Sequence, residues 1–342
     1  MIPWSPAAAT SVGSFPGTEV REVVRIIRGE LPDFLHLPEL PARGPGADVI
    51  GRTLAALSGI DAGFSSTTTP TGWRIDGADT SVMRRGRSWW GEDWDALEEV
   101  AEGYAGPLKV QLCGPWTLAA SVEGVTGERL VRDPGAVRDI AAGLAETARA
   151  QVHEIRRRIP DASPVVQWDE PSLPAVIEGR VRTASGLATY RSVDLPVISR
   201  ALSVVMDVEE DALVGVHCCD AAMPVTVLVD SGAQFLSFDI LGARPADPAV
   251  AAAWEAGVGI LLGCVPAVPA ARPTSEEKAS RAARRYMADL GFEGERYLRE
   301  VAITPTCGLA SADPAWVRAA LGACRTIGRV LRDERTAEGG EE

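Results

Sequence analysis

The sequence predicts an α/β fold, and more specifically a single (β/α)8 TIM barrel. Short apolar runs recur along the chain, and they alternate with stretches whose apolar residues have helical spacing. Eight such strand-and-helix units are expected within the 342 residues, which matches the strand count of a TIM barrel. A doubly wound open sheet shows the same alternation, so the strand count alone leaves both arrangements open.

Each expected strand is a short, mostly apolar run. The runs lie at residues 10–15, 33–37, 108–112, 165–168, 212–216, 234–238, 258–262 and 301–304. Apolar residues at a spacing of 3.6 predict helices at residues 136–158, 195–206, 275–290 and 314–331. Asp194 is a possible N-cap for the second of these helices, and Asp313-Pro314 starts the last with an N-cap and a proline at the first helical position.

Two segments depart from this alternation. Residues 38–106 are rich in proline, serine, threonine and tryptophan, and we expect an insertion after the second strand, partly helical and partly a hairpin. Residues 333–342 are polar and end Gly-Gly-Glu-Glu, which predicts a disordered tail. The expected organisation is therefore one barrel over residues 1–332, with its insertion, followed by a short tail.

Composition excludes several classes of protein. Hydrophobic residues make up 46% of the chain, which is ordinary for a globular protein. The formal net charge of −13 disfavours nucleic acid or an anionic membrane as a partner. No apolar run is long enough for a transmembrane helix, and the N-terminus does not resemble a signal peptide. The six cysteines fit reduced thiols better than a disulfide framework, so we expect a cytoplasmic protein.

The segment Gly215-Val216-His217-Cys218-Cys219-Asp220 follows directly on an apolar strand. In a barrel, the carboxyl ends of the strands form the active-site face. His217 and Cys219 are two residues apart, so in an extended segment their side chains point the same way. An imidazole and a thiolate together favour zinc, but a buried thiol pair beside a hydrogen-bonded histidine fits this short motif as well.

Three further strand ends carry possible ligands. Asp239 closes the strand expected at 234–238, where a carboxylate needs water, a cation or a metal. Cys264 follows the strand at 258–262, and Cys307 follows the strand at 301–304. Side chains from several strands could therefore converge above one barrel mouth, as they do in catalytic zinc sites with three protein ligands and an open position.

Five motifs, in order, span residues 10 to 309. They are Thr10-Ser11-Val12-Gly13-Ser14-Phe15-Pro16, Leu112-Cys113-Gly114-Pro115-Trp116-Thr117-Leu118, Val166-Gln167-Trp168-Asp169-Glu170-Pro171-Ser172-Leu173, the pair His217 and Cys219 with Asp239 after it, and Thr304-Pro305-Thr306-Cys307-Gly308-Leu309. Together they resemble the catalytic, C-terminal barrel of the cobalamin-independent methionine synthases. A length of 342 residues allows one barrel only, so the chain is most similar to the short archaeal and bacterial members of that family.

The resemblance implies a zinc site and a reaction. His217, Cys219, Asp239 and Cys307 match the family's ligands, with Asp239 standing where the family has glutamate. The metal in that family activates the thiol of homocysteine. The implied activity is that of a zinc-dependent methyltransferase in methionine biosynthesis, which transfers a methyl group to L-homocysteine.

The resemblance also implies how the substrate is bound. The backbone of Val12, Gly13 and Ser14 would hold the carboxylate of the substrate, and Asp169, together with Glu39, would hold its ammonium group. Besides homocysteine, the chain would need a methyl donor, and a corrinoid protein is one candidate.

Two departures bear on that donor. Cys264 aligns with the family's proton-donating histidine, so we name it with Asp169 as a candidate catalytic residue. Ala175 stands where the family has a glutamate that helps to hold the pterin. Methyl-folate needs protonation at nitrogen before its methyl group can leave, so both changes disfavour folate and favour methylcobalamin or a corrinoid protein.

Two alternatives stay open at this point. The first is a zinc-dependent alkyltransferase of the same superfamily that acts on another thiol, such as coenzyme M. Asp169 argues for homocysteine, because coenzyme M has no amino group to pair with it. The second is a non-catalytic barrel stabilised by zinc, which would need neither Asp169 nor the turn at residues 12–14.

Overall fold

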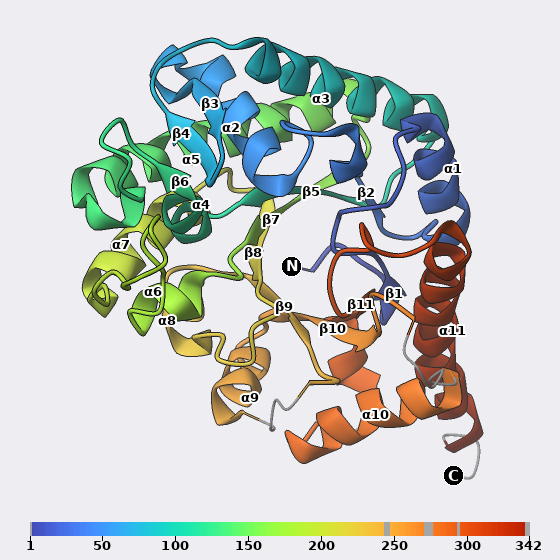
Figure 1. Cartoon of the computed structure of the whole chain (residues 1–342). Helices are drawn as coiled ribbons and strands as arrows, with labels where there is room; N and C mark the ends of the chain where they lie inside the picture. The colour runs from blue at the N-terminus through green and yellow to red at the C-terminus, as the bar shows by residue number, and fades with distance from the viewer. Residues whose placement is uncertain (1, 243–246, 270–275, 293–294, 339–342) are drawn as a thin grey trace.

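A computed structural model describes residues 2–242, 247–269, 276–292 and 295–338 of the chain. Its main sheet has eight parallel strands in the order β1-β11-β10-β9-β8-β7-β5-β2. Their bounds are β1 Ala8–Ala9, β2 Leu35–His36, β5 Pro107–Cys113, β7 Ser163–Asp169, β8 Leu213–His217, β9 Phe235–Asp239, β10 Gly259–Val265 and β11 Val301–Pro305. The strands form a ring with the helices around its outside (Figure 1).

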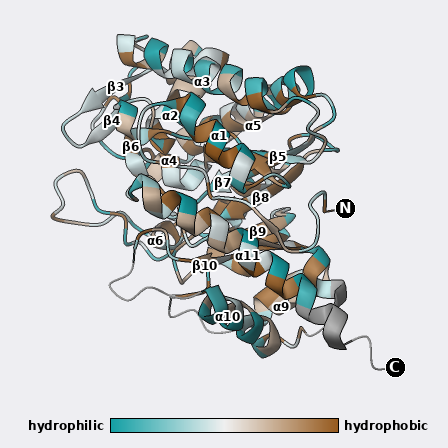
Figure 2. Cartoon of the chain, turned by 90° about the vertical axis from the view of Figure 1, so that its right-hand side faces the viewer, coloured by the Kyte–Doolittle hydropathy of each residue, from teal (hydrophilic) through white to brown (hydrophobic). Residues whose placement is uncertain are grey.

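The helices cover the outer face of this ring. They are α1 Val20–Glu30, α2 Val49–Ile60, α3 Ser81–Val100, α4 Pro115–Ser121, α5 Pro134–Arg158, α6 Leu173–Ile177, α7 Leu195–Met206, α8 Val225–Asp230, α9 Pro248–Glu255, α10 Glu276–Asp289 and α11 Pro314–Glu338. Figure 2 shows hydrophilic and hydrophobic residues along both α1 and α3, as expected of amphipathic helices that pack on a core. Within the described ranges, none of the helices is both long and apolar enough to span a membrane.

The two ends of the sheet meet just beyond β1 and β2, which are only two residues long. There Ser14 and Glu39 form a parallel bridge. The N–H of Phe15 donates to the carbonyl of Glu39 at 2.8 Å, and the N–H of Glu39 donates to the carbonyl of Gly13 at 3.1 Å. These main-chain bonds join the first two strands at their carboxyl ends. The prediction of a barrel is confirmed, and the open sheet is excluded.

The expected first strand is displaced. Residues 10–15 form an irregular segment that begins where β1 ends, rather than a strand. This segment passes close to β5, since a Cβ atom at Gly13 would come within 2.7 Å of the Gln111 side chain. The N–H of Thr10 still donates to the carbonyl of Ile303, at 3.0 Å, and beyond it the chain passes closely over the Gln111 side chain.

The segment 38–106 contains α2, α3 and a hairpin of β3 (Ser66–Thr69) and β4 (Gly72–Ile75). Strand β4 also pairs with β6 (Val122–Glu123), which gives a second, three-stranded sheet. Trp90 and Trp94 on α3 both donate to the Gln151 side-chain oxygen on α5, at 2.8 and 3.0 Å. These tryptophans therefore anchor α3 to the body of the barrel.

The side chains inside the barrel change from apolar to polar along its axis. Its lower layer is an apolar cluster of Trp4, Ala8, Phe34, Val165, Leu213, Phe235, Leu261 and Ala302. Inward positions alternate along a strand, so residues two and four further on point into the same interior. Those positions are polar and buried in several strands, including Lys109, Gln111, Gln167 and Ser237. The interior of the barrel is thus apolar at the amino ends of its strands and polar towards their carboxyl ends.

The C-terminus differs from the expectation of a tail that starts at residue 333. Helix α11 continues through Glu338, while residues 339–342 of the expected tail lie outside the described residues. The segment after Leu331 contains Arg, Glu and Ala, which are good helix formers even without apolar packing.

Candidate metal centre and substrate site

One imidazole and two thiols converge at the carboxyl ends of the strands. His217 ends β8, Cys219 follows two residues later, and Cys307 follows β11. Their nitrogen and sulfur ligand atoms all lie within 4.8 Å of one another. His217 is buried and the two cysteines are half-buried. The structure therefore brings together three of the four predicted metal ligands.

The ring of His217 is oriented as a metal ligand would be. Its Nδ1 atom lies 3.0 Å from the hydroxyl of Ser237 on β9. Its Nε2 atom is buried and has no hydrogen-bond partner. A metal-bound histidine almost always uses its second ring nitrogen in such a hydrogen bond. With two sulfurs beside the free nitrogen, the donor set fits zinc.

The pKa values of the two thiols are shifted in opposite directions. The neighbouring Cys219 thiol, and after it the nearby His217 ring, lower the pKa of Cys307 to about 4. The same contact with Cys307, together with burial, raises the pKa of Cys219. The cluster therefore already favours one thiolate, which is the form that binds a metal.

Asp239 and Cys264 are not brought into this cluster. The Asp239 carboxylate accepts from the N–H groups of Leu241 and Gly242, at 2.7 and 3.3 Å, and so caps the turn after β9. Cys264 is fully buried in the core, on the opposite side of β10 from the inward-facing Leu261. Burial raises the pKa of this thiol to about 12. We assign Cys264 no catalytic role, because its side chain points away from the barrel mouth.

Asp169 lies beside the cluster. It ends β7 and pairs in register with His217 of β8. Its carboxylate accepts from the Gln167 side-chain amide at 2.8 Å. Loss of hydration raises the pKa of Asp169 to about 6, against the opposing effects of His217 and then Lys109.

Glu39 supplies a second carboxylate at the same end of the barrel. It follows β2 and its side chain is only 3% exposed. Burial is the main cause that raises its pKa to about 7; the positive charge of Arg52 opposes that rise, and the negative charge of Asp169 adds to it. The two carboxylates are thus close enough for the charge of Asp169 to affect the ionisation of Glu39.

The 12–14 turn lies next to these groups. The carbonyl of Val12 accepts from Lys109 Nζ at 2.7 Å and from Gln167 Nε2 at 2.9 Å. The carbonyl of Ser14 accepts from the N–H of Leu309 at 2.7 Å, in the loop that carries Cys307. The turn is thus attached both to the polar interior and to the loop with the second thiol.

Lys109, Gln111 and Gln167 did not emerge from the sequence as site residues. They are buried on β5 and β7. Their side chains donate to the main chain of two segments, the 12–14 turn and the segment after β2. The Gln111 side chain donates to the carbonyl of Leu37 at 2.7 Å. A signal existed in the sequence, because polar residues alternate with apolar ones at 109 and 111 in a strand that is otherwise apolar.

Glu170, next to Asp169, has a structural task. Its buried carboxylate accepts from the N–H groups of Trp116 and Thr117, at 2.9 and 2.8 Å, and from the Thr117 hydroxyl at 2.7 Å. It thereby caps α4, which has no side-chain cap at Gly114. Asp169 and Glu170 are neighbours in sequence, but only Asp169 lies at the metal cluster.

We expect Glu170→Ala to lower the free energy of unfolding by about 1–3 kcal/mol for each buried donor left without a partner. Urea denaturation measures this loss, and the exposed Glu178→Ala provides the control. The zinc content should not change. An equal effect of both substitutions would contradict a capping role for Glu170.

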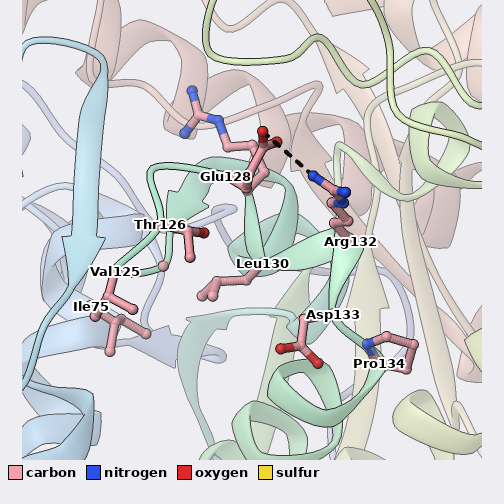
Figure 3. Close-up of a pocket in the computed structure, with 10 residues that line it drawn as sticks. Ile75, Val125, Thr126, Glu128, Leu130, Arg132, Asp133 and Pro134 are labelled. Carbon is pink, nitrogen blue, oxygen red and sulfur yellow. Dashed lines mark ion pairs between the residues drawn. The ribbon is translucent and has the colours of Figure 1, made fainter.

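A surface cavity of about 660 Å³ lies apart from this chemistry (Figure 3). It is lined by Ile75, Gly124, Val125, Thr126, Glu128, Arg129, Leu130, Arg132, Asp133 and Pro134. Glu128 and Arg132 form an ion pair across 3.5 Å at its edge. None of the predicted site residues lines this cavity, so it is not part of the candidate site.

The fold and the cluster define a class, namely a TIM barrel whose mouth holds a candidate zinc–thiolate site. Residues 96–329 match the family described as "Cobalamin-independent synthase, Catalytic domain". Since the match covers more than half of the chain, the protein belongs to that family. The resemblance drawn from the sequence motifs is confirmed.

Comparison of structures gives the same fold. A B12-independent methionine synthase from Shewanella sp. W3-18-1, in complex with selenomethionine, has a TM-score of 0.61 at 12% identity, with 98% of this chain and 99% of that chain covered. A β-mannanase from the blue mussel Mytilus edulis has a TM-score of 0.45 at 11% identity, with 97% and 93% covered, which is too distant to support an inference. No curated protein sequence matches the chain with significance.

Proposed function

We propose that this chain is a zinc-dependent methyltransferase that converts L-homocysteine to methionine. One observation carries the proposal: the cluster of His217, Cys219 and Cys307 lies beside the carboxylate of Asp169 in a single barrel mouth. A thiol ligand for a metal and an ammonium group for a carboxylate are the two ends of homocysteine. The Shewanella enzyme, whose structure holds selenomethionine, supports an amino-acid ligand of this skeleton.

Three side chains of this protein would hold the zinc, namely His217 through Nε2 and the two cysteines through sulfur. Three protein ligands with an open position are typical of catalytic zinc. When bound, zinc would keep the substrate sulfur as a thiolate at neutral pH, where a free thiol with a pKa of about 8.5 is mostly protonated. Asp239 would become a fourth ligand only if its carboxylate left the turn that it caps.

The remaining residues would bind and orient the substrate. The backbone of the 12–14 turn would hold the carboxylate of the substrate, and Asp169 and Glu39 would accept its ammonium group. With both ends fixed, the sulfur faces a methyl donor in line, and such positioning accounts for much of the rate in transfer reactions. A cytoplasmic location suits this chemistry, because all six cysteines are free thiols.

The position of Cys264 supports a methyl donor other than methyl-folate. We expect poor turnover with methyl-folate, because Cys264 stands where the family has a proton donor and its thiol is buried away from the site. Loss of a general acid typically costs about 10²–10⁴-fold in rate. A methyl-corrinoid releases a cobalt species and needs no protonation at nitrogen, so methylcobalamin or a corrinoid protein is the better donor.

The test supplies zinc-loaded protein with homocysteine and each donor separately, and measures methionine by mass spectrometry. His217→Ala serves as the inactive control. Rapid turnover with methyl-folate would show that another group donates the proton. Equal methylation of coenzyme M and homocysteine would favour the alternative thiol substrate, and no methylation of any thiol would favour a non-catalytic barrel.

A further inference from the structure

Asp93 is a buried carboxylate on α3, within the segment 38–106 that follows β2. It accepts from two guanidinium groups, from Arg43 Nη1 at 2.8 Å and from Arg52 Nη1 at 3.0 Å. Both arginine side chains are buried as well, at 7% and 5% exposed. Charged side chains lie this deep almost only when they are paired, so the three form one buried unit, the Arg43–Asp93–Arg52 triad.

A second residue of α3 helps to hold the triad in place. The guanidinium carbon of Arg52 lies 4.2 Å from the ring centroid of Trp90, which is three residues before Asp93. A guanidinium over an aromatic ring at this distance is a favourable contact, and it restricts where the side chain can go. Helix α3 therefore fixes Arg52 in two ways, by an ion pair and by a ring contact.

Each arginine of the triad also donates to a main-chain carbonyl near the barrel mouth. Arg52 Nη1 donates to the carbonyl of Pro38 at 2.5 Å. Arg43 Nε donates to the carbonyl of Thr18 at 3.0 Å. Pro38 directly precedes Glu39, and Thr18 lies in the segment that continues the substrate turn. The triad thus connects α3 to both of the segments that contain candidate substrate-binding groups.

The bond from Arg52 completes the fixation of the backbone at Glu39. The carbonyl of Pro38 and the N–H of Glu39 belong to one planar peptide unit. Arg52 donates to that carbonyl, and the N–H donates to the carbonyl of Gly13 at 3.1 Å. The next peptide unit is held through the carbonyl of Glu39, which accepts from the N–H of Phe15 at 2.8 Å. With both flanking peptide units fixed, the direction in which the Glu39 side chain leaves the backbone is fixed too.

We propose that Asp93 is a positioning residue, which orients Glu39 towards the ammonium group of the amino-acid substrate by holding Arg52 on the preceding carbonyl and Arg43 on the neighbouring segment. This inference rests on the proposed function, because it takes Glu39 as a group that binds the substrate. Asp93 itself touches no ligand and acts through the two arginines. It gives α3, which carries none of the three convergent metal ligands, a part in substrate recognition.

Calorimetry tests this on the full-length, zinc-loaded protein with two ligands, methionine and 4-(methylsulfanyl)butanoate, which lacks the amino group. Neither measurement depends on a methyl donor. In Asp93→Asn, we expect the affinity for methionine to fall by roughly tenfold or more, while the affinity for the analogue changes much less, because the analogue has no group for Glu39 to accept. The zinc content should not change. An equal loss of both ligands would show a merely structural role and overturn the proposal.

A matched control lies on the same helix. Asp95 is exposed and pairs with Arg158 at 2.8 Å, so Asp95→Asn removes a similar charge from α3 without touching the triad. It should keep the preference of the wild type. Arg43→Met removes the bond to Thr18 and leaves Arg52 paired with Asp93. We expect it to lower the same preference at a smaller cost in stability, and it decides the question if Asp93→Asn does not fold.

A double-mutant cycle shows whether Asp93 acts through Glu39. Glu39→Gln removes the charge that would receive the ammonium group. In that background, Asp93→Asn should cost little further affinity for methionine, whereas in the wild-type background it should cost the full factor. Additive losses in the double variant would overturn the proposal.

The two hypotheses fail in different ways. A wild-type protein that binds neither homocysteine nor methionine overturns the proposed function, and with it this inference. A wild-type protein that prefers methionine over the analogue, with an unchanged preference in Asp93→Asn, overturns only the role of Asp93.

Discussion

Replacing His217 by alanine, or Cys307 by serine, should abolish zinc binding and methyl transfer together while the barrel stays folded. The reason is that these two side chains, with Cys219, are the donor atoms that converge within 4.8 Å. Even removal of a hydrogen-bond partner of a metal-bound histidine typically costs about 10–100-fold in metal affinity. Ser237→Ala should therefore lose roughly that factor, and the direct ligands should lose more. Zinc content by atomic emission and circular dichroism of the same samples measure both effects.

A cysteine outside the cluster provides the matched control. Cys324 is buried on α11, so Cys324→Ala should keep one zinc per chain. Cys264→Ala should also keep both zinc and activity, because its thiol faces the helices. Full zinc occupancy in the Cys219→Ser, Cys307→Ser double variant would refute the metal centre proposed above.

Asp169→Asn should weaken homocysteine binding at least a hundredfold without loss of zinc. The substitution keeps the shape of the side chain but removes the charge that would pair with the substrate ammonium group. Breaking one side of a buried charged pair typically costs about 3–5 kcal/mol. Steady-state kinetics should show a raised KM for homocysteine, and zinc analysis should show an unchanged metal content.

The thiol of coenzyme M gives the comparison for this variant. It has no amino group, so any activity with it should be insensitive to Asp169→Asn. Unchanged kinetics with homocysteine would assign Asp169 a structural role, and coenzyme M would then become the better candidate substrate.

Much of the fold could be predicted because the inner strands are read directly from apolar runs. Strands β5 and β7–β11 each include most of an expected run, since a strand covered by helices on one side and by the barrel interior on the other must be apolar. Of the first two strands, β2 lies within its expected run, but β1 ends before the run expected at residues 10–15. Both strands are short. The ring closes beyond them through two main-chain hydrogen bonds between residues 13–15 and Glu39, and no side-chain pattern in the sequence indicates such bonds.

The candidate site could also be predicted only in part. His217, Cys219, Cys307 and Asp169 could be proposed because strand ends in a barrel meet at one face, so a motif at a strand end is already roughly located. Cys264 was proposed in the same way, but the structure places it in the core, because neighbouring residues of a strand point to opposite faces. A motif indicates at which strand end a residue lies. Whether its side chain points into the barrel mouth depends on the alternation of side chains along that strand.

The sequence by itself determined the fold class, the family and the strand ends that carry the possible metal ligands. Only the tertiary structure decided that three ligands converge while the Asp239 carboxylate caps a turn, that Glu170 caps α4, and that the buried Lys109 donates to the carbonyl of Val12. The physical reason is that residue types and the order of motifs, which indicate the family and the possible ligands, can be read from the sequence. Convergence, burial and charge balance depend on distances between strands far apart in the chain, and the closed barrel alone sets those distances.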